Sequence, residues 1–196
     1  MMLSFVLPVL AVTASNPMPD YPAQKVLDAF ATACSGIEDM AVAQASVKAA
    51  GWEEYVPSDD DPLGKLIAIG KQIMAVDDEL VHVDGGAFHK TVAGRDLHLV
   101  LSGATVDTVS SFGCRIYDFA ATEPLSIEIA KDWAVRDPTD SSIPFKGATK
   151  YVWNPGMKPG HMEMEISFVE QDAEVPGNFP VRGLVLTAQV LEIEGL

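Results

Sequence analysis

The clearest chemical pattern in the sequence is His161, Glu163 and Glu165, which alternate along one stretch of the chain. In a β-strand, residues two apart point to the same face, so an imidazole and two carboxylates would share one side. These groups are ligands for a divalent metal and also the usual acids and bases of hydrolases. However, same-face neighbours lie about 7 Å apart, and a half-exposed strand needs polar residues opposite its apolar face. A solvated strand face is therefore the preferred interpretation, and a metal or acid–base site is the alternative.

His89 and His98 form a second candidate metal site, because they flank a predicted hairpin turn at 93–96. Two imidazoles on neighbouring strands could share a metal ion if a third ligand joined them. Elsewhere the sequence has no Gly-x-Ser-x-Gly elbow, phosphate-binding loop, dinucleotide fingerprint or His-Glu-x-x-His motif. We therefore predict no cofactor and assign no catalytic residue.

The candidate residues belong to stretches in which apolar and polar residues alternate, the pattern of a strand with one buried face. One of them places Cys114 and Ile116 on one face and Arg115, Tyr117 and Phe119 on the other. Alternation of this kind is typical of an antiparallel sheet with one covered face. The predicted strands are 88–92, 97–101, 112–119, 148–153, 161–170 and 183–192.

Helices are predicted where apolar residues recur at intervals of three and four. Pro22 suits the first turn of a helix that ends at Cys34, and Ser35 to Glu38 has the form of a capping box for the next. The predicted helices are 22–34, 35–51, 63–75 and 122–133. Together these elements predict an α+β fold, with N-terminal helices packed on an antiparallel sheet of about six strands in the order αα(α)βββαβββ.

The N-terminus predicts export from the cytoplasm. Residues 1–15 contain an apolar run of about ten residues followed by small residues, which is the pattern of a secretory signal peptide. Residues 16–22 are a proline-rich lead-in, and 23–196 are predicted to form a single α+β domain. A buried N-terminal strand, or a start site that lies further upstream, is the alternative. Export predicts a periplasmic or secreted protein.

The sequence contains two cysteines, Cys34 and Cys114. In an oxidising compartment they can form one intrachain disulfide bond, whereas in a reducing one they would be small buried apolar residues. Arg115 is the only basic or histidine residue adjoining either cysteine, so neither has the surroundings of a catalytic thiol.

Composition limits the class of partner. A formal charge of −15, from 28 acidic and 13 basic residues, would repel nucleic acid and anionic lipid. After the N-terminal run no segment is long and apolar enough to predict a membrane span. An unidentified protein or a small molecule is therefore the expected partner.

Several low-specificity motifs resemble an uncharacterised family of secreted alphaproteobacterial proteins. The resemblance rests on a helix with Phe30 and Cys34, the Gly51–Trp52 pair, and Cys114 on a later strand. It covers residues 26–56 and 97–134. It implies export and paired cysteines, and it carries over no function.

From these observations we expect a secreted or periplasmic protein that binds a partner protein or small ligand without catalysis. The site would be a partly open sheet face, marked by an exposed apolar patch that includes Tyr151, Trp153 or Phe179. The alternatives are a metal-assisted hydrolase, with the histidines and glutamates named above, and an envelope structural or stress protein.

Overall fold

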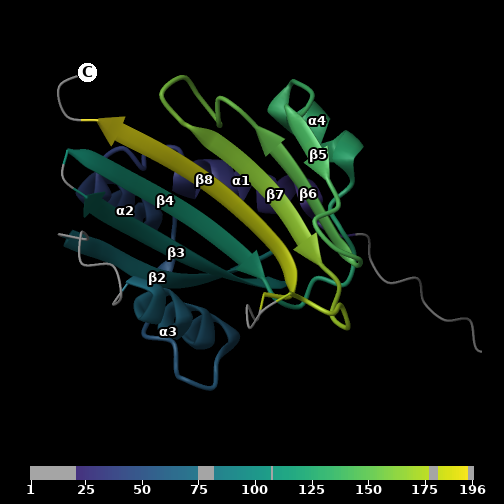
Figure 1. Ribbon diagram of the computed structural model, residues 1–196, viewed down its shortest axis with the longest axis horizontal. Coiled ribbons are helices and arrows are strands. Elements are labelled where there is room, and N and C mark those ends of the chain that lie inside the picture. Colours follow the sequence, from purple (N-terminus) through teal and green to yellow (C-terminus); the bar gives the residue numbers. More distant parts are fainter. Residues whose placement is uncertain (1–20, 75–81, 107, 177–180, 194–196) are drawn as a thin grey trace, which may run out of the picture.

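The computed structural model describes residues 21–74, 82–106, 108–176 and 181–193, which form four helices and eight strands (Figure 1). The predicted signal peptide at 1–15 and residues 16–20 of the lead-in lie outside this part of the chain. The elements are α1 (Ala23–Cys34), α2 (Met40–Ala49), β1 (Glu53–Glu54), α3 (Pro62–Met74), β2 (His82–Val92), β3 (Arg95–Val106), β4 (Val109–Asp118), α4 (Ile127–Ala134), β5 (Asp140–Ser142), β6 (Ala148–Trp153), β7 (Glu163–Val169) and β8 (Gly183–Ile193).

The strands form one antiparallel sheet in the order β1-β2-β3-β4-β8-β7-β6-β5. Two three-stranded meanders, β2-β3-β4 and β6-β7-β8, meet where β4 pairs with β8. The predicted combination of helices and an antiparallel sheet is confirmed, but the number of strands and the order of elements were wrong. The two additional strands, β1 and β5, have only two and three residues, so they are too short to show an alternating pattern.

The apolar side chains of the strands point to one face of the sheet, where α1, α2 and α4 cover them. Helix α1 crosses the central strand β4, α2 lies against β2 and β3, and α4 packs beside α1 through the Phe30 and Trp133 rings. Burial of each large apolar side chain here stabilises the fold by about 1.5–3 kcal/mol. The buried strand residues include Leu97, Leu99, Leu101, Cys114, Ile116, Met164, Ile166, Phe168, Leu184 and Leu186.

The second face of the sheet is covered only in part. Helix α3 packs there through Leu63 and Leu66 against Ala87, Tyr117 and Val185. The prediction of a single covered face was therefore incomplete, because the apolar stripe of a helix does not reveal which side of a sheet it will meet. In Figure 1, α1 and α2 lie behind the strands, and the parts of β4, β8 and β7 that α3 leaves uncovered face the reader.

Two predicted helix starts were wrong. Residues 35–38 form a turn, and α2 begins at Met40 with the Asp39 carboxylate accepting a hydrogen bond from the Val42 N–H. The capping box does not form, because Ile37 is buried in the core and Glu38 pairs with Lys158. Helix α4 likewise begins at Ile127 rather than in 122–126.

The predicted disulfide bond between Cys34 and Cys114 is present, with Cα atoms 5.5 Å apart and both side chains fully buried. It connects the last residue of α1 to the centre of the sheet. A disulfide bond is compatible with the predicted export. Within the described ranges, no helix has both the length and the apolar character needed to cross a membrane.

Candidate functional site

A hollow with a volume of about 320 Å³ lies on the part of the second sheet face that α3 leaves uncovered. Its floor is made of outward-pointing residues from β4, β8, β7 and β6, which are neighbours in the sheet but not in the sequence. Strand pairing places Arg115, Thr187 and Glu165 in one row across these strands. The next row is Tyr117, Val185, Ser167 and Lys150.

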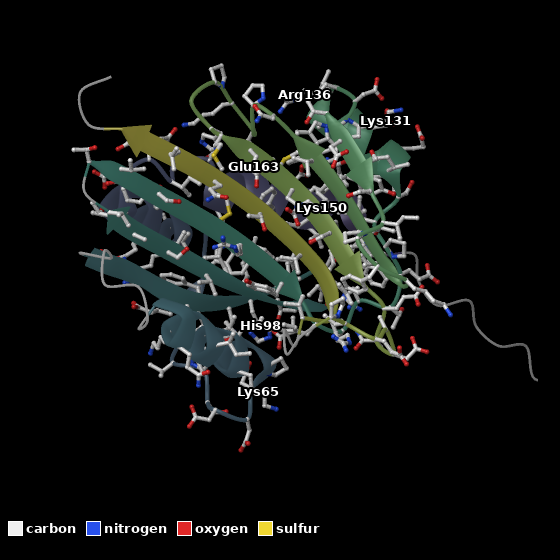
Figure 2. The ribbon with its side chains drawn as sticks, viewed as in Figure 1. Lys65, His98, Lys131, Arg136, Lys150 and Glu163 are labelled. Atoms are coloured by element: carbon white, nitrogen blue, oxygen red, sulfur yellow. A yellow bond between two sulfur atoms is a disulfide. The ribbon has the colours of Figure 1, made fainter. Side chains whose placement is uncertain are left out.

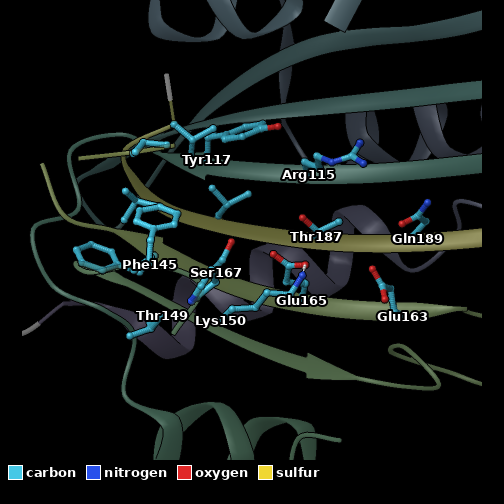
Figure 3. Close-up of a pocket in the computed structure, with 17 residues that line it drawn as sticks. Arg115, Tyr117, Phe145, Thr149, Lys150, Glu163, Glu165, Ser167, Thr187 and Gln189 are labelled. Atoms are coloured by element: carbon cyan, nitrogen blue, oxygen red, sulfur yellow. Dashed lines mark ion pairs between the residues drawn. The ribbon is translucent and has the colours of Figure 1, made fainter. Parts of the chain in front are cut away.

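The hollow is apolar at one end and polar at the other. Figure 3 shows Tyr117 and Phe145 toward one end, and Glu163 and Gln189 at the opposite end. Valine side chains complete the apolar end, namely Val169, Val175, Val181 and Val185. A ligand in the hollow would therefore meet an apolar surface and a hydrogen-bonding surface at the same time.

Two of the charged groups in the hollow neutralise each other. Lys150 Nζ lies 2.6 Å from Glu165 Oε2, so this pair adds little net charge to the site. Among the residues that the structure describes, no ion-pair partner is found for Arg115 or for Glu163. The polar end therefore presents one guanidinium and one carboxylate that are not paired within the described protein.

Arg115 lies across Gly113, two residues before it on β4. A Cβ atom at position 113 would be only 2.9 Å from Arg115 Nη1, so glycine leaves the space that the guanidinium occupies. Arg115 Nη1 donates a hydrogen bond of 3.1 Å to Ser102 Oγ on β3. The remaining N–H groups of a guanidinium, which has five, are available to a ligand.

His161 does not join Glu163 and Glu165, so the predicted grouping of the three residues on one strand face was wrong. Strand β7 begins at Glu163, and the alternation that places Glu163 and Glu165 in the hollow does not extend back to His161. The His161 side chain is buried toward the helices, where Nε2 lies 3.3 Å from Glu38 Oε1. Neither ring nitrogen has a hydrogen bond with correct geometry within the described structure.

The surroundings of His161 favour its neutral form. Burial lowers its pKa below the ordinary 6.5, and the nearby Glu38 carboxylate offsets only part of that effect. Burial raises the pKa of Glu38, but the hydrogen bond from Lys158, a backbone hydrogen bond and the positive charge of Lys158 outweigh it and leave that pKa below its ordinary value. This cluster faces the helical layer and contributes no residue to the hollow.

His89 and His98 are direct partners on β2 and β3, as the predicted hairpin implies. Tyr55 packs against both rings, and its hydroxyl lies 2.6 Å from His98 Nδ1. His89 Nε2 is 3.4 Å from a carboxylate oxygen of Glu53. Across the described residues, no three His, Cys, Asp or Glu side chains are grouped so that they could hold a metal ion.

In Figure 2, Glu163 and Lys150 lie over the uncovered strands, whereas His98 lies next to α3. His98 therefore lies beside α3, and neither histidine lines the hollow.

Trp153 and Tyr151 do not form the expected exposed apolar patch. Trp153 is fully buried, with its indole N–H donating to the Arg136 carbonyl, and Tyr151 packs against the helical core. Phe179 lies outside the described residues. The large apolar side chains that are exposed in the described part do not line the hollow, namely Val42, Val56, Ile129, Val135, Ile143 and Leu191.

Sequence reasoning identified Glu163 and Glu165 but did not assign Arg115, Lys150, Thr187 or Gln189 to a site. The alternation of residues 112–119 placed Arg115 opposite Cys114, on the face away from the core. No local signal indicates that β8 lies between β4 and β7, which is the arrangement that brings these residues together.

Comparison of the chain with protein-family models, with curated proteins and with solved structures finds no match. The resemblance to a family of secreted alphaproteobacterial proteins therefore stays a prediction.

Proposed function

We propose that this chain is an exported, non-catalytic protein that binds a small ligand in the hollow of the uncovered sheet face. The observation that carries the proposal is the hollow itself, which combines an apolar end with a few polar groups that converge at the other. Its volume of about 320 Å³ is at the lower end of the range of small-molecule sites, about 300–1,000 Å³. A small molecule is favoured over a partner protein, because none of the large exposed apolar side chains lines the hollow, and the hollow itself has the size of a small-molecule site.

The chemistry of the hollow supports binding more than catalysis. The residues that line it within the described chain include the hydroxyls of Ser167 and Thr187 but no histidine or cysteine. A hydroxyl becomes a useful nucleophile only when a base lies next to it. Lys150 and Glu165 are occupied with each other. The metal-assisted hydrolase and the envelope structural or stress protein stay alternatives that no contact in the hollow favours.

The proposal is tested with anilinonaphthalene sulfonate, a fluorescent probe with apolar rings and one anionic group. We expect a saturable rise in fluorescence at a one-to-one ratio of probe to protein. Ser167→Tyr, which fills the floor of the hollow with a residue that suits a strand, should abolish that rise.

The matched control is Thr91→Tyr, which adds the same side chain at an exposed strand position that does not line the hollow. This variant should bind the probe as the wild type does. Near-ultraviolet circular dichroism must show fixed tertiary packing in every sample, because loosely packed proteins also bind such dyes. Equal binding by both variants would contradict the proposal, and so would a wild type that binds neither this dye nor any other small molecule with an apolar ring.

A further inference from the structure

The polar end of the hollow has the groups needed to bind a carboxylate. The planar fork of a guanidinium matches a carboxylate with two parallel hydrogen bonds. Arg115 makes one hydrogen bond to Ser102 and has no ion-pair partner in the described protein, so most of its donors are free. The absence of a Cβ at Gly113 holds the guanidinium over the sheet rather than in solvent.

The same end has a group that would bind a cation. Strand pairing places Gly113, Gln189 and Glu163 in one row on β4, β8 and β7. Adjacent strands are about 4.8 Å apart, so the row sets the guanidinium over Gly113 about two strand spacings from the backbone of Glu163. Gln189 lies between them and donates its amide N–H to Ser111 Oγ, which leaves its carbonyl oxygen as an acceptor.

The two unpaired charges favour a ligand that carries both charges over a ligand that carries only one. An anion bound to Arg115 would also lie near the Glu163 carboxylate, and a cation bound to Glu163 would lie near the guanidinium. A ligand with both charges has a partner for each of them, and the unfavourable pairings discriminate against the others. A zwitterion also has no net charge, so the −15 of the whole chain does not repel it.

The apolar end sets the size of the rest of the ligand. Along β8, Val185 lies one same-face step, about 7 Å, from Thr187. A ligand held by its charged groups beside Thr187 and Gln189 would therefore place its body between Tyr117, Val185 and Phe145. That space suits one apolar or aromatic group rather than a long chain.

We infer, on the basis of the binding function proposed above, that the ligand is a free α-amino acid with an apolar or aromatic side chain. Arg115 binds its carboxylate, Glu163 binds its ammonium group, and the apolar end of the hollow receives its side chain. The geometric basis is an unpaired guanidinium that lies over Gly113 and an unpaired carboxylate on Glu163, which is in the same row as Gly113 two strands away, next to an apolar space.

The test is calorimetric titration of the wild type with three probes that share one ring. Phenylalanine carries both charges, phenylpropionate lacks the ammonium group, and phenethylamine lacks the carboxylate. A hydrogen bond to a charged group is worth enough to change affinity by about tenfold or more. Phenylalanine should therefore bind at least about tenfold more tightly than either of the other two probes.

Two variants test which residue binds the carboxylate of the ligand and which binds its ammonium group. Arg115→Gln should reduce the affinity for phenylalanine by about tenfold and leave phenethylamine no weaker. Glu163→Gln should reduce the affinity for phenylalanine by a similar factor and should not reduce the affinity for phenylpropionate. Glu192→Gln is the control, since it removes one negative charge from an exposed position on β8 outside the hollow. It should leave all three affinities unchanged.

The possible failures are distinguishable. The inference that the ligand is a zwitterion is wrong if phenylpropionate binds as tightly as phenylalanine, or if Glu163→Gln leaves the affinity for phenylalanine unchanged. The proposed binding in the hollow would still stand. If none of the three probes binds but the fluorescent dye does, the inferred ligand class is likewise overturned. If neither the dye nor any of the three probes binds the wild type, the proposed function itself fails.

Discussion

The disulfide bond should be the largest single contribution to the stability of this chain. It closes a loop with a sequence separation of 80 residues. In the chain-entropy model, a crosslink over that length stabilises the fold by about 4.5 kcal/mol. For a protein of this size, 1 kcal/mol corresponds to a shift in Tm of about 2–4 °C, so loss of the bond should lower Tm by about 9–18 °C.

The assay is thermal unfolding, followed by circular dichroism, of the wild type and of the variant with Cys34→Ala and Cys114→Ala. Both sulfur atoms are buried, so a reductant added to the folded protein would reach them slowly. A second sample, wild type that is unfolded, reduced and refolded, keeps both sulfur atoms in the core and loses only the crosslink. It therefore separates the effect of the crosslink from that of the void that alanine leaves.

A fall in Tm of less than about 3 °C in the reduced sample would refute this reasoning, because even the shortest loops in the same model are expected to contribute more. Below its transition the reduced protein should still bind the fluorescent probe with the wild-type affinity. The bond lies on the helical side of the sheet, and the hollow lies on the other side.

Two further predictions concern buried polar groups. Asp118 is 1% exposed and accepts two hydrogen bonds of 2.7 Å from Arg95, whose side chain is 26% exposed. Asp118→Asn should lower the free energy of unfolding in guanidinium by about 2–3 kcal/mol, less than for a fully buried pair because solvent screens Arg95. Burial lowers the pKa of His161 below 6.5, so near that pH the unfolded chain binds more protons than the folded one. Wild-type Tm should therefore fall as the pH drops below about 6.5, and His161→Leu should reduce that fall.

Each of these variants has a surface counterpart. Glu128→Gln removes one member of an exposed pair with Lys131 at 4.0 Å and should change the free energy of unfolding far less than Asp118→Asn, because solvent screens the pair. An equal loss in Glu128→Gln and Asp118→Asn would show that burial does not set the cost. His89→Leu removes a partly exposed imidazole from the other face of the sheet. The same dependence of Tm on pH in the wild type and in His161→Leu would show that His161 is not the group responsible.

The pattern of apolar and polar residues predicted the helices and strands in which buried and exposed residues recur at regular intervals. Leu97, Leu99 and Leu101 alternate because one face of β3 meets the helices, and this period is visible without a structure. The cysteine pair could be predicted for a different reason, since a chain with two cysteines in an oxidising compartment has one possible internal bond. The strands β1 and β5 could not be predicted from the sequence, because two or three polar residues at the edge of a sheet are too few to show an alternation of apolar and polar residues.

The candidate site was harder to predict than the fold, because it depends on the order of the strands. Arg115 and Glu163 are 48 residues apart in sequence and share a surface only because β8 lies between β4 and β7. The rule that residues two apart point to the same face also holds only within a strand. His161 is two residues from Glu163 but precedes β7, and it lies in the core instead of the hollow.

The two faces of the sheet therefore hold polar groups in different ways. On the helical side the carboxylates have partners, since Asp118 binds Arg95 and Glu38 binds Lys158. In the hollow, Arg115 and Glu163 point to the same space without an ion pair between them or to any other described residue. A charge that folding alone required would be expected to have such a partner, because an unpaired charge that is partly buried costs stability. Natural proteins depart from this pattern mainly at functional sites, so this departure supports the proposal that the uncovered face binds the ligand.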